Sequence, residues 1–376
     1  MNFPHLNEKH IPVDYLAHKD TDAALRRYFN VSNEHELLNL LGADFFYLPG
    51  RDISQNEGIL PCYRGKPLEM SKTERTCPLQ ICWRRGAYDS KFTVDEAISG
   101  PLQRAEISEK EILSFPWLRA SDFDFSSLQG EADDNSNRIR IGGLWTGIMG
   151  DSYRMHGFEN FLYNLAANPI VIHTLIDRMT DMYLELNDAY FSALKGRIEI
   201  WFFGNDFGSQ ESMLLSRDMW EEYFFANINR LCALAHSYGI KVMMHSCGAI
   251  APLIPLLIKA GVDILDPIQI TAKGMSAVEL AAQFKGQITF HGGIDTQNIL
   301  PLCTRDAVQK HVRETVSILA PDINLKKNTG GSQAAICGGA AGYIFAPSQI
   351  LGPDIPLENI HAMYDTIHEI NAAREA

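Results

Sequence analysis

The chain has 376 residues, of which 46% are hydrophobic and 21% charged, a composition that can bury a large core and excludes intrinsic disorder. Its 46 acidic residues outnumber its 33 basic ones, and the resulting net charge of −13 disfavours nucleic acid and anionic membrane surfaces as partners. No apolar run follows a basic start at the N-terminus, and seven scattered cysteines do not form a disulfide pattern, so we expect a soluble, cytoplasmic protein.

The first part of the chain contains few periodic segments. Asn33 and Glu36 form a capping box, which predicts a short leucine-rich helix that ends at Gly42. Residues 43–48 are predicted as the first strand, and turn residues and acidic runs fill most of the following stretch. We therefore expect residues 1–137 to hold this strand and an elaboration that covers one face of the domain, without forming an independent domain.

From Arg138 onward, predicted strands and helices alternate. The predicted strands are residues 139–144, 198–203, 240–244, 262–265, 287–290 and 343–345. Helices are predicted to begin after Asn168, Ser216, Ser276 and Thr304, near Ala251 and near Pro356. This alternation is typical of a parallel sheet.

The number of repeats favours one closed (β/α)₈ barrel over its alternative, a doubly wound sheet. We expect a single α/β domain over residues 1–376, with residues 138–376 as the main barrel core. The Gly-, Ser-, Asn- and Lys-containing segment 322–341 is predicted to be a lid over the barrel mouth.

Polar side chains follow five consecutive predicted strands. In chain order they are Asp206 and Gln210, then His245, then Asp266 and Gln269, then His291, Asp295 and Gln297, and finally Gln349. In a parallel barrel these strand ends meet at one rim, where active sites lie. Turn formation alone explains an Asp or Asn at such positions, but it explains the Gln and His residues less well. We therefore expect this rim to carry the functional site.

His245 and Cys247 are two residues apart at a strand end, so their side chains share one face. An imidazole and a thiolate on one face provide half of a zinc site. The alternative is a buried cysteine packed beside a hydrogen-bonded histidine. A zinc site needs a third protein ligand, for which Cys337, Asp206 and Glu211 are all candidates.

Several of these rim segments resemble the uroporphyrinogen decarboxylase (URO-D) superfamily. The similar segments are residues 242–248 (VMMHSCG), 261–267 (GVDILDP), 290–297 (FHGGIDTQ), 342–348 (GYIFAPS) and 356–363 (PLENIHAM). The resemblance implies a TIM-type (β/α)₈ barrel. The superfamily contains decarboxylases of a tetrapyrrole and zinc-dependent methyltransferases that work with corrinoid proteins.

The two branches of the superfamily differ in their motifs. The decarboxylases carry an N-terminal Arg-Gln-Ala-Gly-Arg-type motif that holds the substrate carboxylates. Within residues 49–137 of this chain, Arg84 and Arg85 are the only adjacent arginines, and they lie in another context. The methyltransferases resemble this chain at His-x-Cys-Gly, which implies that His245 and Cys247 are zinc ligands. Their third ligand is a Cys just after the last strand, where this chain has Ser348 and Gln349, so Cys337 is our expected substitute.

The resemblance thus favours a zinc-dependent methyltransferase that moves a methyl group between a small molecule and a corrinoid (cobalamin) on a partner protein. We expect His245, Cys247 and Cys337 to bind Zn²⁺, and Asp206, Asp266 and Asp295 to orient the substrate or move a proton. Gln210, Gln269, His291, Gln297 and Gln349 are expected to bind the substrate. The alternatives are a metal-free decarboxylase and a non-catalytic corrinoid- or tetrapyrrole-binding protein. We expect a monomer or a homodimer.

Overall fold

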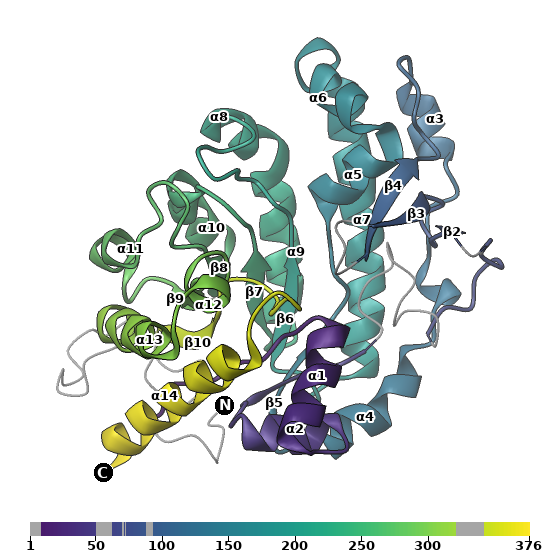
Figure 1. The fold of residues 1–376 in the computed structure, drawn as a ribbon. Helices are drawn as coiled ribbons and strands as arrows, with labels where there is room; N and C mark the ends of the chain where they lie inside the picture. The colour runs from purple at the N-terminus through teal and green to yellow at the C-terminus, as the bar shows by residue number, and fades with distance from the viewer. Residues whose placement is uncertain (1–8, 50–61, 70, 72, 88–92, 321–341) are drawn as a thin grey trace.

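The computed structural model describes the chain except for residues 1–8, 50–61, 70, 72, 88–92 and 321–341, so the predicted lid lies outside the described residues (Figure 1). Seven parallel strands form one sheet, in the order β1-β5-β6-β7-β8-β9-β10. Their bounds are Phe45–Tyr47, Ile139–Gly142, Ile200–Gly204, Lys241–His245, Ile264–Ile268, Thr289–Ile294 and Tyr343–Pro347. Each matches a strand that the sequence predicts, with ends shifted by a few residues.

A short segment near the N-terminus connects the two edges of this sheet. Val13 forms a parallel bridge with Phe345 of β10, whose N–H donates to the Pro12 carbonyl over 2.8 Å. On its other side, the Val13 carbonyl accepts the N–H of Asp44, just before β1, over 2.8 Å. The segment takes the place of an eighth strand, which confirms the predicted α/β, TIM-type barrel. The sequence does not predict this strand, because it is very short and contains a proline.

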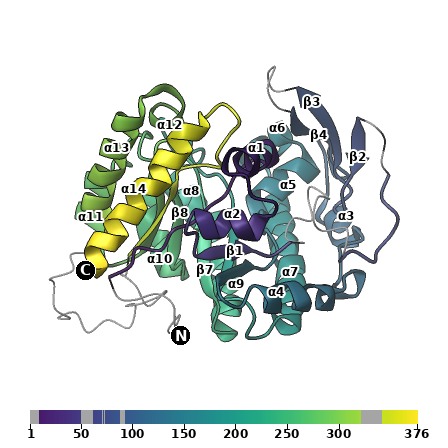
Figure 2. The ribbon, with the colours of Figure 1, turned by 60° about the horizontal axis from the view of Figure 1, so that its bottom comes forward.

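Helices surround the sheet (Figure 2). Those after residue 168 are α7 (Pro169–Ala193), α8 (Arg217–Trp220), α9 (Ala226–Ser237), α10 (Ile254–Ala260), α11 (Ala277–Phe284), α12 (Ile299–Leu302), α13 (Arg305–Leu319) and α14 (Leu357–Glu375). The side chains of Ser216, Ser276 and Thr304 cap α8, α11 and α13 as predicted. Asn168 precedes α7 but makes no side-chain cap bond, so Pro169 at the first helical position is what marks this start.

The N-terminal region is more regular than the sequence predicts. After α1 (Lys19–Phe29) and α2 (Glu34–Leu40), an antiparallel sheet forms from β2 (Glu74–Thr76), β3 (Cys82–Ala87) and β4 (Thr93–Ser99). Helices α3 (Glu109–Ser114), α4 (Gln129–Asp134), α5 (Ile148–His156) and α6 (Phe158–Ala167) complete this side of the molecule, on the right in Figure 1. The sheet is hidden in the sequence because charged pairs such as Arg84–Glu74 and Arg85–Asp95 join its strands.

The barrel interior holds its own apolar cluster, apart from the larger layer between strands and helices. Its buried members are Phe45, Ile139, Ile141, Ile200, Phe202, Met243, Ile264 and Ile344, and the partly buried Tyr47 and Trp145 pack against them. This cluster fills the barrel below its mouth. Within the described residues, no helix is both long and apolar enough to cross a membrane.

Helix α14 holds residues 11–14, which we call the closing segment, in place. The Asn371 amide accepts the Ile11 N–H over 2.9 Å and donates to the Ile11 carbonyl over 3.0 Å, and Asn371 is buried. Asn371→Ala leaves both backbone groups without these partners, so we expect the free energy of unfolding to fall by about 1–3 kcal/mol. Urea unfolding measures this change. Lys310→Ala, at an exposed site on α13, is the control, and an equally small effect of both changes would contradict the expectation.

Candidate functional site

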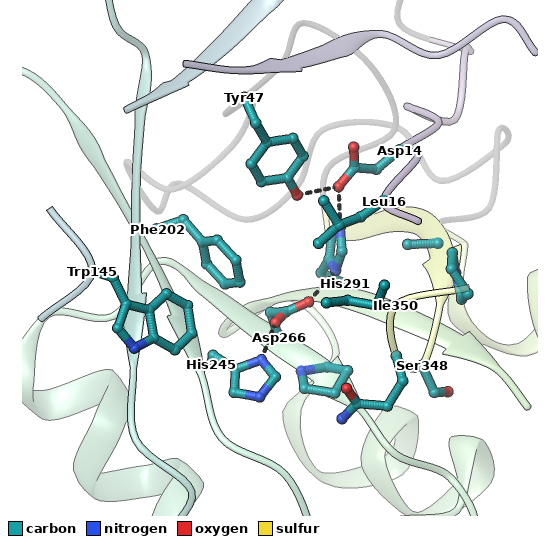
Figure 3. Close-up of a pocket in the computed structure, with 14 residues that line it drawn as sticks. Asp14, Leu16, Tyr47, Trp145, Phe202, His245, Asp266, His291, Ser348 and Ile350 are labelled. Carbon is teal, nitrogen blue, oxygen red and sulfur yellow. Dashed lines mark hydrogen bonds and ion pairs between the residues drawn. The ribbon is translucent and has the colours of Figure 1, made fainter. Parts of the chain in front are cut away.

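A cavity of about 310 Å³ opens where the strands of the barrel end (Figure 3). The rings of Tyr47, Trp145 and Phe202 lie on one side, and Leu16 and Ile350 lie on the other. The Phe202 ring meets the Tyr47 and Trp145 rings edge to face, with centroids 6.1 Å and 5.1 Å apart. The cavity therefore has apolar, largely aromatic walls.

A row of ionisable side chains crosses this cavity. The Asp266 carboxylate lies between two imidazoles, 2.6 Å from His245 Nδ1 and 2.5 Å from His291 Nδ1. His291 Nε2 lies 2.9 Å from Asp14 Oδ2, which also accepts the Tyr47 hydroxyl over 2.5 Å. Acidic and imidazole groups thus alternate from the closing segment to the end of β7.

His291 is held as an imidazolium by this arrangement. Both of its ring nitrogens face carboxylate oxygens, so both must carry protons to avoid repulsion. Burial opposes the charge, but Asp266 and Asp14 outweigh it and raise the pKa of His291 to about 10. Burial also works against the Asp266 carboxylate, yet His291 and His245 hold its pKa far below the usual range. The buried charges of the cavity are therefore paired inside the protein.

A second group of side chains lies at the end of the row. Asp206, His245 and Cys247 each offer a ligand atom, and these atoms all lie within 4.8 Å of one another. His245 Nε2 lies 3.2 Å from Cys247 Sγ and 3.3 Å from Asp206 Oδ1. A nitrogen, a sulfur and a carboxylate oxygen form a donor set that suits zinc. We call these three residues the rim cluster.

Asp266 fixes the orientation of the His245 ring within the rim cluster. Its bond to Nδ1 leaves Nε2 directed toward Asp206 and Cys247, which is how a second carboxylate orients a metal-binding histidine. Burial opposes protonation of His245, but Asp206 and Asp266 raise its pKa well above the ordinary value. Burial likewise opposes the Asp206 charge, and His245 nevertheless lowers the pKa of Asp206 to about 2. The contacts of His245 with Asp206 and Asp266 thus set the protonation of the rim cluster.

Backbone contacts between loops bring the rim cluster together. The Cys247 N–H donates to Asp206 Oδ1 over 3.0 Å, and the Gly248 N–H donates to Gln269 Oε1 over 3.0 Å. Gly248 has φ +90°, and a Cβ there would lie 2.5 Å from the backbone of Gly208. The glycine therefore lets the loops after β6 and β7 approach closely enough for Asp206 to meet His245.

The structure brings together six of the residues that the sequence singles out: Asp206, His245, Cys247, Asp266, His291 and Gln349. Gln349 Nε2 lies 2.6 Å from Cys247 Sγ, at the position after the last strand. Gln269 contacts the loop after β7 through Gly248, as described above. Cys337 lies outside the described residues.

The other predicted residues lie elsewhere on the rim. The Asp295 carboxylate accepts the N–H groups of Gln297 (2.7 Å) and Asn298 (3.0 Å), so it stabilises its own turn. The Gln297 side chain accepts the Thr271 hydroxyl over 3.1 Å at an exposed position. Gln210 is exposed and meets the Lys273 N–H through its backbone carbonyl. None of the three is among the described residues that line the cavity.

Sequence reasoning did not find Asp14, Tyr47, Trp145 or Phe202. Asp14 follows a strand of only a few residues, and its polar side chain after Val13 is the single available signal. Tyr47 and Phe202 lie within strands, where an aromatic residue normally indicates core packing. Their inward direction depends on the strand register, which the sequence does not specify.

Comparison with known proteins identifies solved structures of similar fold and a matching family model. The chain is similar to a methyltransferase from Methanosarcina mazei, with 13% identity and a TM-score of 0.60, over 96% of this chain and 94% of that one. It is more distantly similar to D-psicose 3-epimerase, with 12% identity and a TM-score of 0.32, over 72% and 86% of the two chains. None of the curated proteins compared with the sequence matches it. A family model described as uroporphyrinogen decarboxylase (URO-D) matches residues 135–370, more than half of the chain. The chain therefore belongs to the uroporphyrinogen decarboxylase (URO-D) family.

Proposed function

We propose that the protein is a zinc-dependent methyltransferase that moves a methyl group between a small molecule and a corrinoid on a partner protein. The observation that carries the proposal is the rim cluster of Asp206, His245 and Cys247 at the edge of the cavity. The fold similarity to a methyltransferase is consistent with this function but shows the fold alone.

The residues of the rim cluster fit Zn²⁺. Catalytic zinc sites commonly use three protein ligands and keep a further position open for a substrate or water. We propose Asp206, His245 Nε2 and Cys247 Sγ as these ligands, so that Asp206 takes the place expected for Cys337. Asp206 is exposed, which leaves the cluster accessible from outside the barrel.

Bound zinc would supply Lewis acidity to the oxygen or sulfur atom that carries or receives the methyl group. The protein contributes the geometry. Asp266 retains the proton on His245 Nδ1 and so keeps Nε2 available as a ligand. The Gln349 amide contacts Cys247 Sγ and restrains the thiolate. The apolar cavity walls exclude water from the reacting end of the small molecule.

A polycarboxylate substrate fits this cavity poorly. Among the described residues that line it, none is Lys or Arg, and Asp14 and Asp266 contribute carboxylates. An anionic substrate needs positive partners when it is buried. Decarboxylation of a tetrapyrrole is therefore the weaker candidate.

The first experiment is a measurement of metal content in the purified full-length protein after zinc is supplied. We expect about one zinc per chain, and we expect Cys247→Ser to lose most of it because a hydroxyl is a far weaker zinc ligand than a thiolate. Cys303→Ser is the matched control, because Cys303 is partly exposed at the end of α12. Equal zinc content in all three proteins would exclude the rim cluster as the metal site.

Methyl transfer is then measured directly. Wild type and Cys303→Ser should methylate reduced cobalamin, or demethylate methylcobalamin, in the presence of a suitable small molecule, and Cys247→Ser should not. Release of carbon dioxide from a small acid that continues after chelation would instead support the decarboxylase alternative.

A further inference from the structure

The loop that carries Trp145 follows β5 and leads into α5. Trp145 is partly buried and lines the cavity, and the centroid of its ring lies 5.6 Å from that of the His245 ring. Gly147 stands at the N-cap of α5 and has no side chain that could accept the first N–H groups of the helix. These N–H groups therefore need a partner from elsewhere in the chain.

Asn205 supplies this partner from the end of β6. Its side-chain oxygen accepts the Met149 N–H over 2.7 Å and the Gly150 N–H over 3.1 Å. Met149 and Gly150 are the second and third residues of α5, the two positions whose N–H groups an N-cap side chain normally accepts. A residue from another element thus caps the helix, and its bonds tie the start of α5 to the end of β6.

The backbone of Asn205 is joined to the rim cluster. Its N–H donates to the His245 carbonyl over 3.1 Å, and the next residue in the chain is Asp206. Asn205 is buried, and its Nδ2 lies 3.5 Å from the carbonyl oxygen of Thr146, the residue after Trp145. One buried side chain therefore connects the Trp145 loop to the strand ends that carry Asp206 and His245.

A second buried amide holds the same loop from the side of α7. The Asn187 side chain accepts the Leu144 N–H over 2.8 Å and donates to the Thr146 hydroxyl over 3.0 Å. These two bonds lie on either side of Trp145 in the chain and connect the loop to α7. Asn187 thus shapes the loop, whereas Asn205 sets the place of the loop relative to the rim cluster.

We propose that Asn205 is a positioning residue that holds the Trp145 ring at a fixed place beside the rim cluster. Without its side chain, the Met149 and Gly150 N–H groups would be buried without this acceptor, which is unfavourable. The loop would then shift or open to water, and the cavity would lose its closed aromatic side next to His245. This role does not depend on which reaction the protein catalyses.

Acrylamide quenching of tryptophan fluorescence tests the proposal in the full-length protein. The chain has five tryptophans, so each protein is also made with Trp145→Phe, and the difference within each pair gives the contribution of Trp145. In Asn205→Ala we expect the quenching constant of Trp145 to rise at least about twofold, because its loop has lost a partner. Asn205→Asp should restore a nearly wild-type value, since its carboxylate accepts the same N–H groups and a negative charge is favourable at a helix N-terminus.

Asn229→Ala is the matched control and should leave the quenching of Trp145 unchanged. Asn229 donates from α9 to the Ala260 carbonyl over 3.2 Å and is not among the described residues that line the cavity. Urea unfolding establishes that each variant is folded under the conditions of the measurement. If Asn205→Ala is not folded, Asn205→Ser takes its place, because the shorter side chain cannot reach both N–H groups.

Wild-type quenching of Trp145 in a folded Asn205→Ala or Asn205→Ser protein would overturn the proposal. An Asn205→Asp protein in which Trp145 is as accessible as in the alanine variant would also overturn it. The measurement requires neither metal nor turnover, so its failure and the failure of the proposed function are separate results.

Discussion

Asp266→Asn is expected to weaken zinc binding by about 10- to 100-fold. The Asp266 carboxylate accepts from His245 Nδ1 with one oxygen and contacts His291 Nδ1 with the other. Asparagine has one oxygen acceptor and one NH₂ donor, so it can satisfy only one of the two imidazole N–H groups and repels the other. The His245 ring then loses the partner that directs Nε2 toward Asp206 and Cys247. Competition with a chromophoric zinc chelator measures the affinity.

The matched control is Asp263→Asn, the same chemical change just before the same strand. Asp263 pairs with His236 and Lys241 at the opposite end of β8, far from the cavity mouth. It should lower stability somewhat and leave zinc affinity unchanged. Equal zinc affinities for wild type and Asp266→Asn would show that the carboxylate does not orient His245.

A second large effect is expected in how stability depends on pH. His291 is buried between Asp14 and Asp266, and these carboxylates raise its pKa to about 10 despite the opposing effect of burial. A histidine in an unfolded chain has a pKa of about 6.5. Because the folded value is the higher one, the stabilisation is complete below about pH 6.5 and declines as the pH rises toward 10. Across this window the free energy of unfolding should fall by roughly 1 kcal/mol per pH unit from this group.

Urea unfolding at several pH values between 7 and 9.5 measures this slope. In His291→Gln, the part of the slope that comes from His291 should be absent. The groups that face His291 are Asp14 from the closing segment and Asp266 from β8, with Tyr47 and His245 beyond them. His311→Gln is the control: burial lowers the pKa of His311, so it is neutral throughout the window. The same slope in wild type and His291→Gln would contradict a buried imidazolium.

Much of the barrel could be predicted because its central strands are buried on both sides. Such strands appear in the sequence as short apolar runs between capped helices, as in residues 198–203 and 240–244. The antiparallel strands β2 to β4 lack this pattern, since charged residues occupy their faces. The closing segment around Val13 is short and is positioned by contacts with β10, by the bond from Asp44 before β1 and by α14, none of which a local sequence pattern indicates.

The site residues also differ in whether the nearby sequence or contacts with distant parts of the chain place them. His245, Asp266 and His291 could be found because each directly follows a strand that the sequence predicts. Asp295 looks equivalent to Asp266 in the sequence, yet its carboxylate binds the backbone of its own turn. Asp266 lies within β8, whereas Asp295 follows the end of β9, because the observed strands extend beyond their predicted ends. Asp14, the far partner of His291, was missed because its strand was missed.

The way the barrel closes has a consequence for the order in which a newly made chain acquires its site. The partner of Asp14, His291, is synthesised 277 positions later in the chain. Asn371, which holds Ile11 in place, lies 360 positions away from it. A ribosome-bound chain without α14 can form most of the barrel wall but cannot anchor the strand that carries Asp14. The paired charges of the cavity are therefore completed last, so that an unfinished or shortened chain would remain without a working pocket.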